Sequence, residues 1–191
     1  MAPTQFLCLG EYLLYKGGGS YSINSCEIIE MFYTIRTDLD KLKYVSNITK
    51  IISDVTTENQ NTYRVLQLYL NTLYVIANTD KNLSLVNSIF RLRLMSIIGF
   101  KPIIEECGNC KTKENLNFFS FKDNCLKCET CSLQDKGAMK ITPTTKDSIK
   151  YIILADSKKI YSFEIPEESI KELEIISKIY LENKLEKKYD N

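Results

Sequence analysis

The sequence predicts a mainly α-helical fold, in which a helical bundle carries an inserted four-cysteine knuckle and a short N-terminal β-ribbon. Apolar residues recur every three or four positions through most of residues 24–100 and again after residue 142, the period of helices with one buried face. Five of the seven cysteines fall between residues 107 and 131. An alternating segment with three consecutive glycines precedes the helices and is typical of a hairpin.

The bulk composition is that of a folded chain with one large or two small domains. Of 191 residues, 44% are apolar and 26% are charged, and the net charge is +1. A global basic field is therefore absent, and any nucleic-acid binding must use local patches. No apolar run reaches membrane-spanning length, and the first residues do not resemble a secretory signal. We therefore expect no membrane partner and a cytoplasmic location, where clustered cysteines favour metal over disulfides.

The predicted ribbon consists of two short strands joined by a glycine turn. Alternating residues 5–15 lead into Gly17, Gly18 and Gly19, and residues 21–23 resume the pattern. A two-stranded ribbon is marginal alone, so it must pack on something or belong to a larger sheet. The glycines lack the spacing of a phosphate-binding loop.

Helices are expected from about residue 24 onward. Asp38 is placed to cap the second, Gly99 to end the fourth and Pro143 to begin the fifth. The fourth is apolar around most of its circumference and should be central. The charged tail from Lys184 is expected to fray. The predicted helices cover residues 28–35, 39–55, 65–76, 85–98, 143–154 and 167–180.

The cysteine-rich stretch predicts a metal site. Cys107 and Cys110 form one C-x2-C pair, and Cys125, Cys128 and Cys131 form C-x2-C-x2-C. Two such pairs supply the four thiolates that tetrahedral Zn²⁺ prefers. The spacing alone does not decide whether the second pair is Cys125 with Cys128 or Cys128 with Cys131. Another metal, an iron–sulfur cluster and a redox dithiol are the alternatives. A closed four-thiolate site has no open position for chemistry, so we expect a structural zinc.

No histidine occurs in the chain. This excludes Ser-His-Asp and Cys-His catalysis and every mixed Cys/His metal site. No other catalytic constellation is visible, and we expect a protein that is not an enzyme.

Several segments together resemble one family. The segment Ile89–Pro102 resembles the F-x-L-R-L-L-x-x-x-G-[YF]-x-P signature of the bacterial RecO family of DNA repair proteins, and it leads into Cys107 and Cys110 as in that family. Phe119–Cys131 is similar to the family's F-S-x3-G-G-x2-C-x2-C. The resemblance covers nearly the whole chain and extends to the segments Gly10–Gly17, Phe32–Leu39 and Lys43–Ser46.

The resemblance implies a choice of metal ligands. The family register selects Cys107, Cys110, Cys128 and Cys131, and it leaves Cys125 as a spare or alternative ligand. The family's two glycines are replaced here by Asn124 and Cys125. If both positions kept a left-handed backbone, Asn would tolerate it and Cys would cost about 1 kcal/mol.

The resemblance also implies a domain division. The family begins with a five-stranded OB-fold, whereas this chain carries sequence for only its last strand or two. We therefore expect a partial OB-fold over residues 1–23 and a helical domain over residues 24–191, with the zinc knuckle at residues 103–132. The sequence leaves open whether the earlier strands are truncated or missing from the protein.

The function that the resemblance implies is a non-enzymatic mediator of DNA repair and homologous recombination in the RecF pathway. Such a protein binds single- and double-stranded DNA and the C-terminal tail of single-strand binding protein, anneals strands, and helps RecR load the recombinase at the nucleoid. Arg91, Arg93, Lys122 and Lys127 are the candidate DNA or partner contacts. The alternative is a protein-interaction adaptor that is stabilised by zinc and does not bind DNA. A thiol oxidoreductase is a third class.

Overall fold

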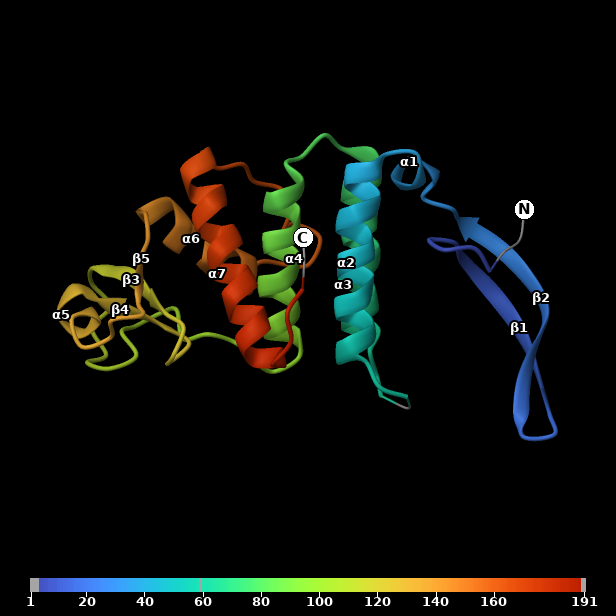
Figure 1. Ribbon diagram of the computed structural model, residues 1–191, viewed down its shortest axis with the longest axis horizontal. Coiled ribbons are helices and arrows are strands. Elements are labelled where there is room, and N and C mark those ends of the chain that lie inside the picture. The colour runs from blue at the N-terminus through green and yellow to red at the C-terminus, as the bar shows by residue number, and fades with distance from the viewer. Residues whose placement is uncertain (1–3, 59, 190–191) are drawn as a thin grey trace.

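The computed structural model describes residues 4–58 and 60–189. The molecule is elongated, with a β-ribbon at one end, helices in the middle and a small sheet at the other end (Figure 1). Helices account for 47% of the described residues and strands for 17%. The fold is thus mixed α/β, and the expected mainly α class is correct only for its central part. The ends of both predicted domains, residues 1–3 and 190–191, and residue 59 lie outside the described residues.

The ribbon is longer than predicted. Strand β1 (Leu9–Gly17) pairs antiparallel with β2 (Ser20–Glu30) through a turn at Gly18 and Gly19, both with positive φ. Strand β2 therefore runs past the domain division expected at residue 23. Ile28 and Ile29 fit the period of a helix together with Phe32 and Ile35, but β-branched side chains also favour strands, and pairing with β1 decides between them.

The helix predicted from residue 28 begins only after this ribbon. Helix α1 (Tyr33–Arg36) is four residues long and lies between the ribbon and the bundle. Of the expected OB-fold, the described residues provide two antiparallel strands and no barrel.

The other helices form where the apolar pattern predicts them. They are α2 (Leu39–Val55), α3 (Tyr63–Asn78), α4 (Leu83–Ile97), α6 (Pro143–Leu154) and α7 (Glu167–Leu185). The Asp38 carboxylate accepts hydrogen bonds from the backbone N–H groups of Asp40 and Lys41, which begins α2 as expected. Gly99 follows α4 with φ of 98°, the left-handed conformation that favours glycine at a helix end.

Helix α4 is the centre of the bundle, as its all-round apolar character predicted. It contacts α2, α3, α6 and α7, and residues on every side of it are buried, including Phe90, Leu92 and Met95. Figure 1 shows α4 between the α2–α3 pair and α7. Side chains from α4 therefore hold both halves of the helical body together.

The cysteine-rich segment contains a sheet that the sequence did not predict. Strands β3 (Leu116–Ser120), β4 (Cys125–Cys128) and β5 (Met139–Lys140) form an antiparallel sheet in the order β4-β3-β5, with the short helix α5 (Glu129–Ser132) after β4. The sheet docks on α7 because the buried Phe119 ring meets the Tyr180 ring edge-on at 5.9 Å. The Tyr180 hydroxyl donates to the Phe100 carbonyl at 2.7 Å, which ties the end of α4 to the same place.

The charged tail was expected to fray, but up to residue 189, where the described residues end, it packs against the helices. Tyr189 is 1% exposed, and its hydroxyl donates to Asp54 on α2 at 2.8 Å. Lys187 forms an ion pair with the same carboxylate at 2.6 Å. The tail thereby links the end of α7 to α2. Among the described residues, no helix has both the length and the hydrophobicity that a membrane span requires.

Candidate functional site

Four cysteines converge at the edge of the small sheet. The sulfur atoms of Cys107, Cys110, Cys128 and Cys131 all lie within 4.8 Å of one another, and those of Cys110 and Cys128 are 3.6 Å apart. Four sulfurs at about 2.3 Å from a tetrahedral Zn²⁺ would be about 3.8 Å from each other. The cluster therefore has the ligand number, the ligand type and the spacing that a tetrahedral metal ion needs.

Two short turns present these sulfurs. In the first, the Lys111 N–H donates to the Cys107 carbonyl at 3.0 Å, and the Cys107 N–H donates to the Thr112 carbonyl at 2.7 Å. In the second, β4 ends at Cys128 and α5 carries Cys131 one turn later. The Gly108 N–H donates to the Leu126 carbonyl at 3.0 Å and joins the two turns. Backbone hydrogen bonds thus fix the cluster from both sides.

The local electrostatics favour a thiolate at Cys107. Burial opposes ionisation there, but backbone N–H groups of Cys110, Cys128 and Asn109 act on its sulfur and lower its pKa to about 6. The neighbouring Cys128 and Cys110 thiols raise the pKa of Cys131 to about 12. The pKa values of Cys107 and Cys131 are therefore shifted in opposite directions by their neighbours. A divalent cation is the kind of charge that would stabilise all four thiolates.

Cys125 stands apart from this cluster. It is fully buried and begins β4, and its sulfur faces Gly108 rather than the other four sulfurs. Burial raises the pKa of its thiol, which suits a neutral side chain. Asn124 adopts φ of 53°, whereas Cys125 is extended. Only the first of the two replaced glycine positions is therefore left-handed, and the cost anticipated for Cys125 does not arise.

Two of the four cations proposed as surface contacts are in the interior. Arg91 on α4 is 1% exposed, and Lys127 on β4 is 3% exposed. Lys127 forms ion pairs with Asp123 at 2.5 Å and Asp135 at 2.9 Å. The burial of both side chains speaks against the expectation that Arg91 and Lys127 offer charge to DNA or a partner. The all-round apolar pattern of α4 already indicated an enclosed helix, so the burial of Arg91 could have been anticipated. The sequence does not indicate that two carboxylates flank Lys127.

The other two proposed cations lie in different places. Lys122 is exposed at the turn before β4. Arg93 is half-buried, and its guanidinium donates to the carbonyls of Ile152 and Ile153 at 3.1 and 2.7 Å, which are among the last carbonyls of α6. Arg93 also lines a surface cavity, which is described below. The structure does not bring the four proposed residues together into one surface.

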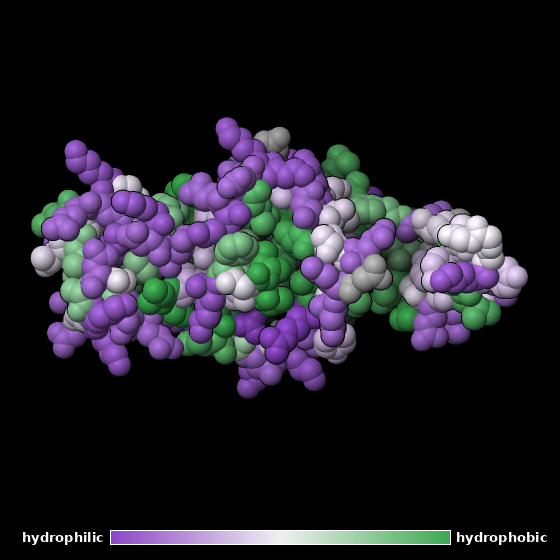
Figure 2. Space-filling view, turned by 90° about the horizontal axis from the view of Figure 1, so that it is seen from below, coloured by the Kyte–Doolittle hydropathy of each residue, from purple (hydrophilic) through white to green (hydrophobic). Residues whose placement is uncertain are grey.

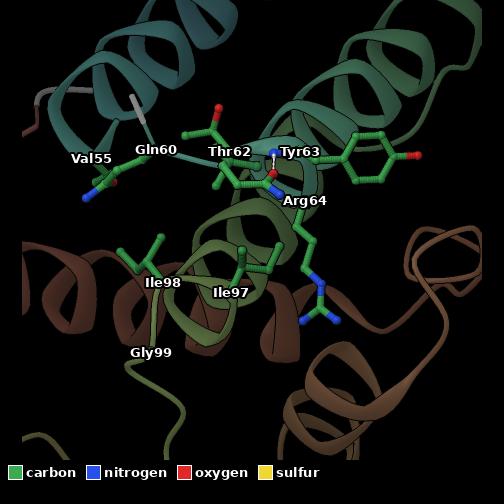
Figure 3. A pocket seen from close by; sticks show the side chains of 10 residues that line it. Val55, Gln60, Thr62, Tyr63, Arg64, Ile97, Ile98 and Gly99 are labelled. Carbon is green, nitrogen blue, oxygen red and sulfur yellow. Dashed lines mark hydrogen bonds between the residues drawn. The ribbon is translucent and has the colours of Figure 1, made fainter. Parts of the chain in front are cut away.

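A groove lies at the lower end of the bundle, where α2 and α4 end and α3 begins. It has a volume of about 690 Å³, and its apolar lining comes from Val55, Val65, Ile97 and Ile98. In Figure 3, Ile97 and Ile98 point toward the segment that joins α2 to α3, and Arg64 extends away along the groove. Figure 2, which shows this end of the molecule, has an apolar area near its middle bordered by hydrophilic side chains.

A second hollow of about 450 Å³ continues from the first and shares Arg64 and Ile97 with it. Its lining adds the cations of Arg93 and Lys101 and one carboxylate, Asp156. The two hollows therefore join an apolar floor to a cationic rim. Sequence reasoning missed Arg64 and Lys101. Lys101 lies within the Ile89–Pro102 signature and could have been noticed, but nothing in the sequence signals Arg64.

The fold and the site together define a class: a helical protein with a docked cysteine knuckle able to hold one metal ion. A family model described as "Recombination protein O C terminal" matches residues 36–191. DNA repair protein RecO of Acetivibrio thermocellus is 38% identical over 190 residues, which cover 99% of this chain and 76% of that protein. The chain belongs to the RecO family.

Other relatives carry the same name. DNA repair protein RecO of Alkaliphilus metalliredigens is 29% identical over 86% of this chain and 68% of its own length. That of Clostridium novyi is 28% identical over 94% of this chain and 72% of its own length. The family resemblance drawn from the signature segments is confirmed, and it supports a role in DNA repair.

Proposed function

We propose that this protein is a non-enzymatic mediator of DNA repair and recombination, which recruits itself to coated single strands by binding the C-terminal tail of single-strand binding protein. The groove is the observation that carries this proposal. An acidic, apolar tail needs an apolar floor for its side chains and cations for its carboxylates, and the joined hollows offer both. From there it would anneal strands and help RecR load the recombinase.

In the proposed complex, each part of the groove has its own role. Ile97 and Ile98 would receive the apolar end of the tail, and Arg64, Arg93 and Lys101 would pair with its carboxylates. Arg93 is the best-positioned of these cations because its bonds to the carbonyls of Ile152 and Ile153 already fix its side chain. Little ordering is then needed on that side of the groove.

The four cysteines would hold one structural Zn²⁺. The fit rests on four sulfurs within 4.8 Å of one another and on the preference of zinc for thiolates. A zinc bound by four thiolates supplies no catalytic position; it fixes the knuckle that docks on α7. The residues that surround it keep the sulfurs in place and complete the ligand set.

Peptide binding can be tested by fluorescence anisotropy with a labelled peptide that has the acidic, apolar C-terminus of a bacterial single-strand binding protein. The double variant Arg64→Glu/Lys101→Glu should weaken binding at least tenfold, because like charges replace attraction. The double variant Lys113→Glu/Lys136→Glu, at two exposed lysines that do not line the groove, makes the same change in net charge and should bind normally. Equal binding by all three proteins would refute the role of the groove.

A second candidate is an adaptor that contacts proteins and not DNA. The burial of Arg91 and Lys127 favours it, because it removes two expected cations from the surface. Titration with labelled single-stranded DNA at several salt concentrations separates the two functions. A mediator that neutralises Z phosphates shows log K falling with log salt at a slope of about −0.7Z. Peptide binding without detectable DNA binding at low salt would establish the adaptor.

A further inference from the structure

The four cysteines of the cluster differ in their contact with solvent. Cys107 is 0% exposed and Cys128 is 8% exposed, Cys131 is half-buried, and Cys110 is exposed. Lys111, which follows Cys110 in the same turn, is also exposed and adopts φ of 63°. The first turn therefore buries its first cysteine and presents its second to water. A reagent dissolved in water reaches the cluster most readily at Cys110.

Cys110 also has a reaction partner within reach. Its sulfur lies 3.6 Å from the sulfur of Cys128, which belongs to the second turn. A small shift of the two turns would bring these sulfurs into bonding distance. An accessible thiolate with a second thiol beside it is the arrangement in which oxidation leads to a disulfide.

We propose that Cys110 is a site of reversible oxidation by hydrogen peroxide, and that the product is a disulfide between Cys110 and Cys128 that excludes zinc from the cluster. The inference rests on the zinc site proposed above. The zinc-bound cluster and the disulfide are then alternative states of the same knuckle, and peroxide converts the first into the second.

The reaction has two steps. In the first, the Cys110 thiolate attacks one oxygen of peroxide; a sulfur–oxygen bond forms, the oxygen–oxygen bond breaks, and hydroxide leaves. In the second, the Cys128 thiolate attacks the sulfur of the resulting sulfenic acid; the disulfide forms, the sulfur–oxygen bond breaks, and a second hydroxide leaves. The two thiolates are oxidised by two electrons in total, and one peroxide molecule is reduced. Cys107 and Cys131 remain, which are too few for the four ligands of a structural zinc site.

The rest of the knuckle does not depend on the oxidised sulfurs. Ion pairs of Lys127 with Asp123 and Asp135 hold β4 to the turns around it. The edge-on contact of Phe119 with Tyr180 holds the sheet on α7. The disulfide joins the two turns, as a bound metal does. We therefore expect oxidation to release zinc without unfolding the helical body.

Zinc release from the purified full chain tests the proposal. Elemental analysis first gives the zinc content, and a chromogenic zinc indicator then follows release in excess hydrogen peroxide. We expect complete release with unchanged far-UV circular dichroism, and rebinding of zinc after reduction with dithiothreitol. Zinc that stays bound in peroxide, or that reduction does not restore, would overturn this inference and leave the zinc site standing. A chain purified without zinc would overturn the zinc site and this inference together.

The position of the disulfide is a separate test by mass spectrometry. Cleavage after Glu129 separates Cys128 from Cys131, and fragmentation of the peptide that contains Cys107 and Cys110 identifies the other half of the bond. The expected bond joins Cys110 to Cys128. A disulfide between any other pair would refute the assignment of Cys110 as the oxidised residue and Cys128 as its partner.

A matched variant tests whether oxidation passes through the three cysteines outside the cluster. Cys8→Ser/Cys26→Ser/Cys125→Ser keeps the four sulfurs of the cluster and should release zinc at the wild-type rate. Clearly slower release would mean that the reaction begins at one of the removed thiols and not at Cys110.

Discussion

The sulfur of Cys125 occupies the space beside Gly108 that any larger residue would need. A Cβ atom added to Gly108 would lie 2.3 Å from this sulfur and 2.9 Å from the Cys125 Cβ, closer than atoms approach in folded proteins. The glycine inside the first C-x2-C pair is therefore required by a cysteine that is outside the four-sulfur cluster. Cys125 therefore has a packing role against Gly108, and its sulfur is outside the four-sulfur cluster.

This contact predicts that Cys125→Ala partly compensates for the destabilisation caused by Gly108→Ala. Gly108→Ala should lower the free energy of unfolding by about 1–3 kcal/mol, the usual cost of overpacking. In the Gly108→Ala/Cys125→Ala double variant the added methyl group enters the space left by the sulfur, so the loss should be smaller than the sum of the two single losses. Urea unfolding of the four proteins measures the coupling. Additive losses would show that the two residues are independent.

The metal ligands are predicted to be Cys107, Cys110, Cys128 and Cys131, with no contribution from Cys125. Cys128→Ser should lose the bound zinc, and Cys125→Ser should keep one zinc per chain. Elemental analysis of the purified proteins distinguishes them. Removing zinc from the wild type with a chelator should unfold the knuckle and leave most helical circular dichroism, because the helical core lies in α2, α3, α4, α6 and α7. Equal zinc loss in both variants would contradict this ligand set.

The helical body was predictable from sequence because helix period, caps and breaks all agree there. Asp38, Gly99 and Pro143 mark boundaries by local chemistry that needs no tertiary information. The end of β2 was not predictable, since the spacing of Ile28 and Ile29 fits a helix as well as a strand and only pairing with β1 decides.

The candidate site also has one part that the sequence predicts and one part that it does not. Cysteine spacing predicts the metal cluster, because the ligands are close in sequence and the turns are short. The groove is built from residues on α2, α3, α4 and the segment after α6, whose proximity depends on helix packing. The burial of Arg91 follows from the central place that the apolar pattern predicts for α4. The pairing of Lys127 with Asp123 and Asp135 is local in sequence, but it depends on how β4 and the turns around it fold.

Lys127 is predicted to stabilise the knuckle through its ion pairs with Asp123 and Asp135. Lys127→Ala leaves Asp135, whose side chain is 9% exposed and which also accepts from Ser120 at 2.5 Å, without its cation. We expect a loss of about 1–3 kcal/mol in the free energy of unfolding. Lys122→Ala, at an exposed lysine in the turn before β4, is the control and should change little. Equal stability of the two variants would show that the pair contributes nothing.

The same ion pair gives a pH dependence. Bonds from Ser120 and Lys127 hold the pKa of Asp135 below its ordinary 3.8, so its contribution is complete above that pH and is lost as pH falls further. Asp123 and Asp135 raise the pKa of Lys127 above its ordinary 10.5, so its contribution is complete below that pH and is lost as pH rises further. The difference in stability between wild type and Lys127→Ala should be constant from about pH 4.5 to pH 10 and should shrink on both sides.

Arg93 and Arg64 are predicted to differ in role although both line the cationic hollow. Arg93→Met removes two hydrogen bonds to carbonyls of α6 and should cost about 1–3 kcal/mol of stability as well as peptide affinity. Arg64→Met should weaken peptide binding and leave the unfolding free energy within about 0.5 kcal/mol of wild type, because Arg64 is exposed. Calorimetric unfolding and anisotropy on both variants test this. A stability loss at Arg64 equal to that at Arg93 would refute the distinction.

Tyr189 is predicted to fasten the C-terminal tail to α2. Its hydroxyl donates to Asp54, the Lys187 ammonium pairs with the other oxygen of that carboxylate, and its ring is buried. Tyr189→Phe should keep the ring packed and cost about 1 kcal/mol, whereas Tyr189→Ala should also empty the space and cost about 3–5 kcal/mol.

Lys187 and Tyr189 lower the pKa of Asp54, so the contribution of this carboxylate to stability is present above its ordinary pKa of 3.8 and is lost as pH falls below it. Urea unfolding at pH 7 and pH 3 should therefore show a smaller penalty for Tyr189→Phe at the lower pH. An unchanged penalty would mean that the hydroxyl does not depend on the charge of Asp54.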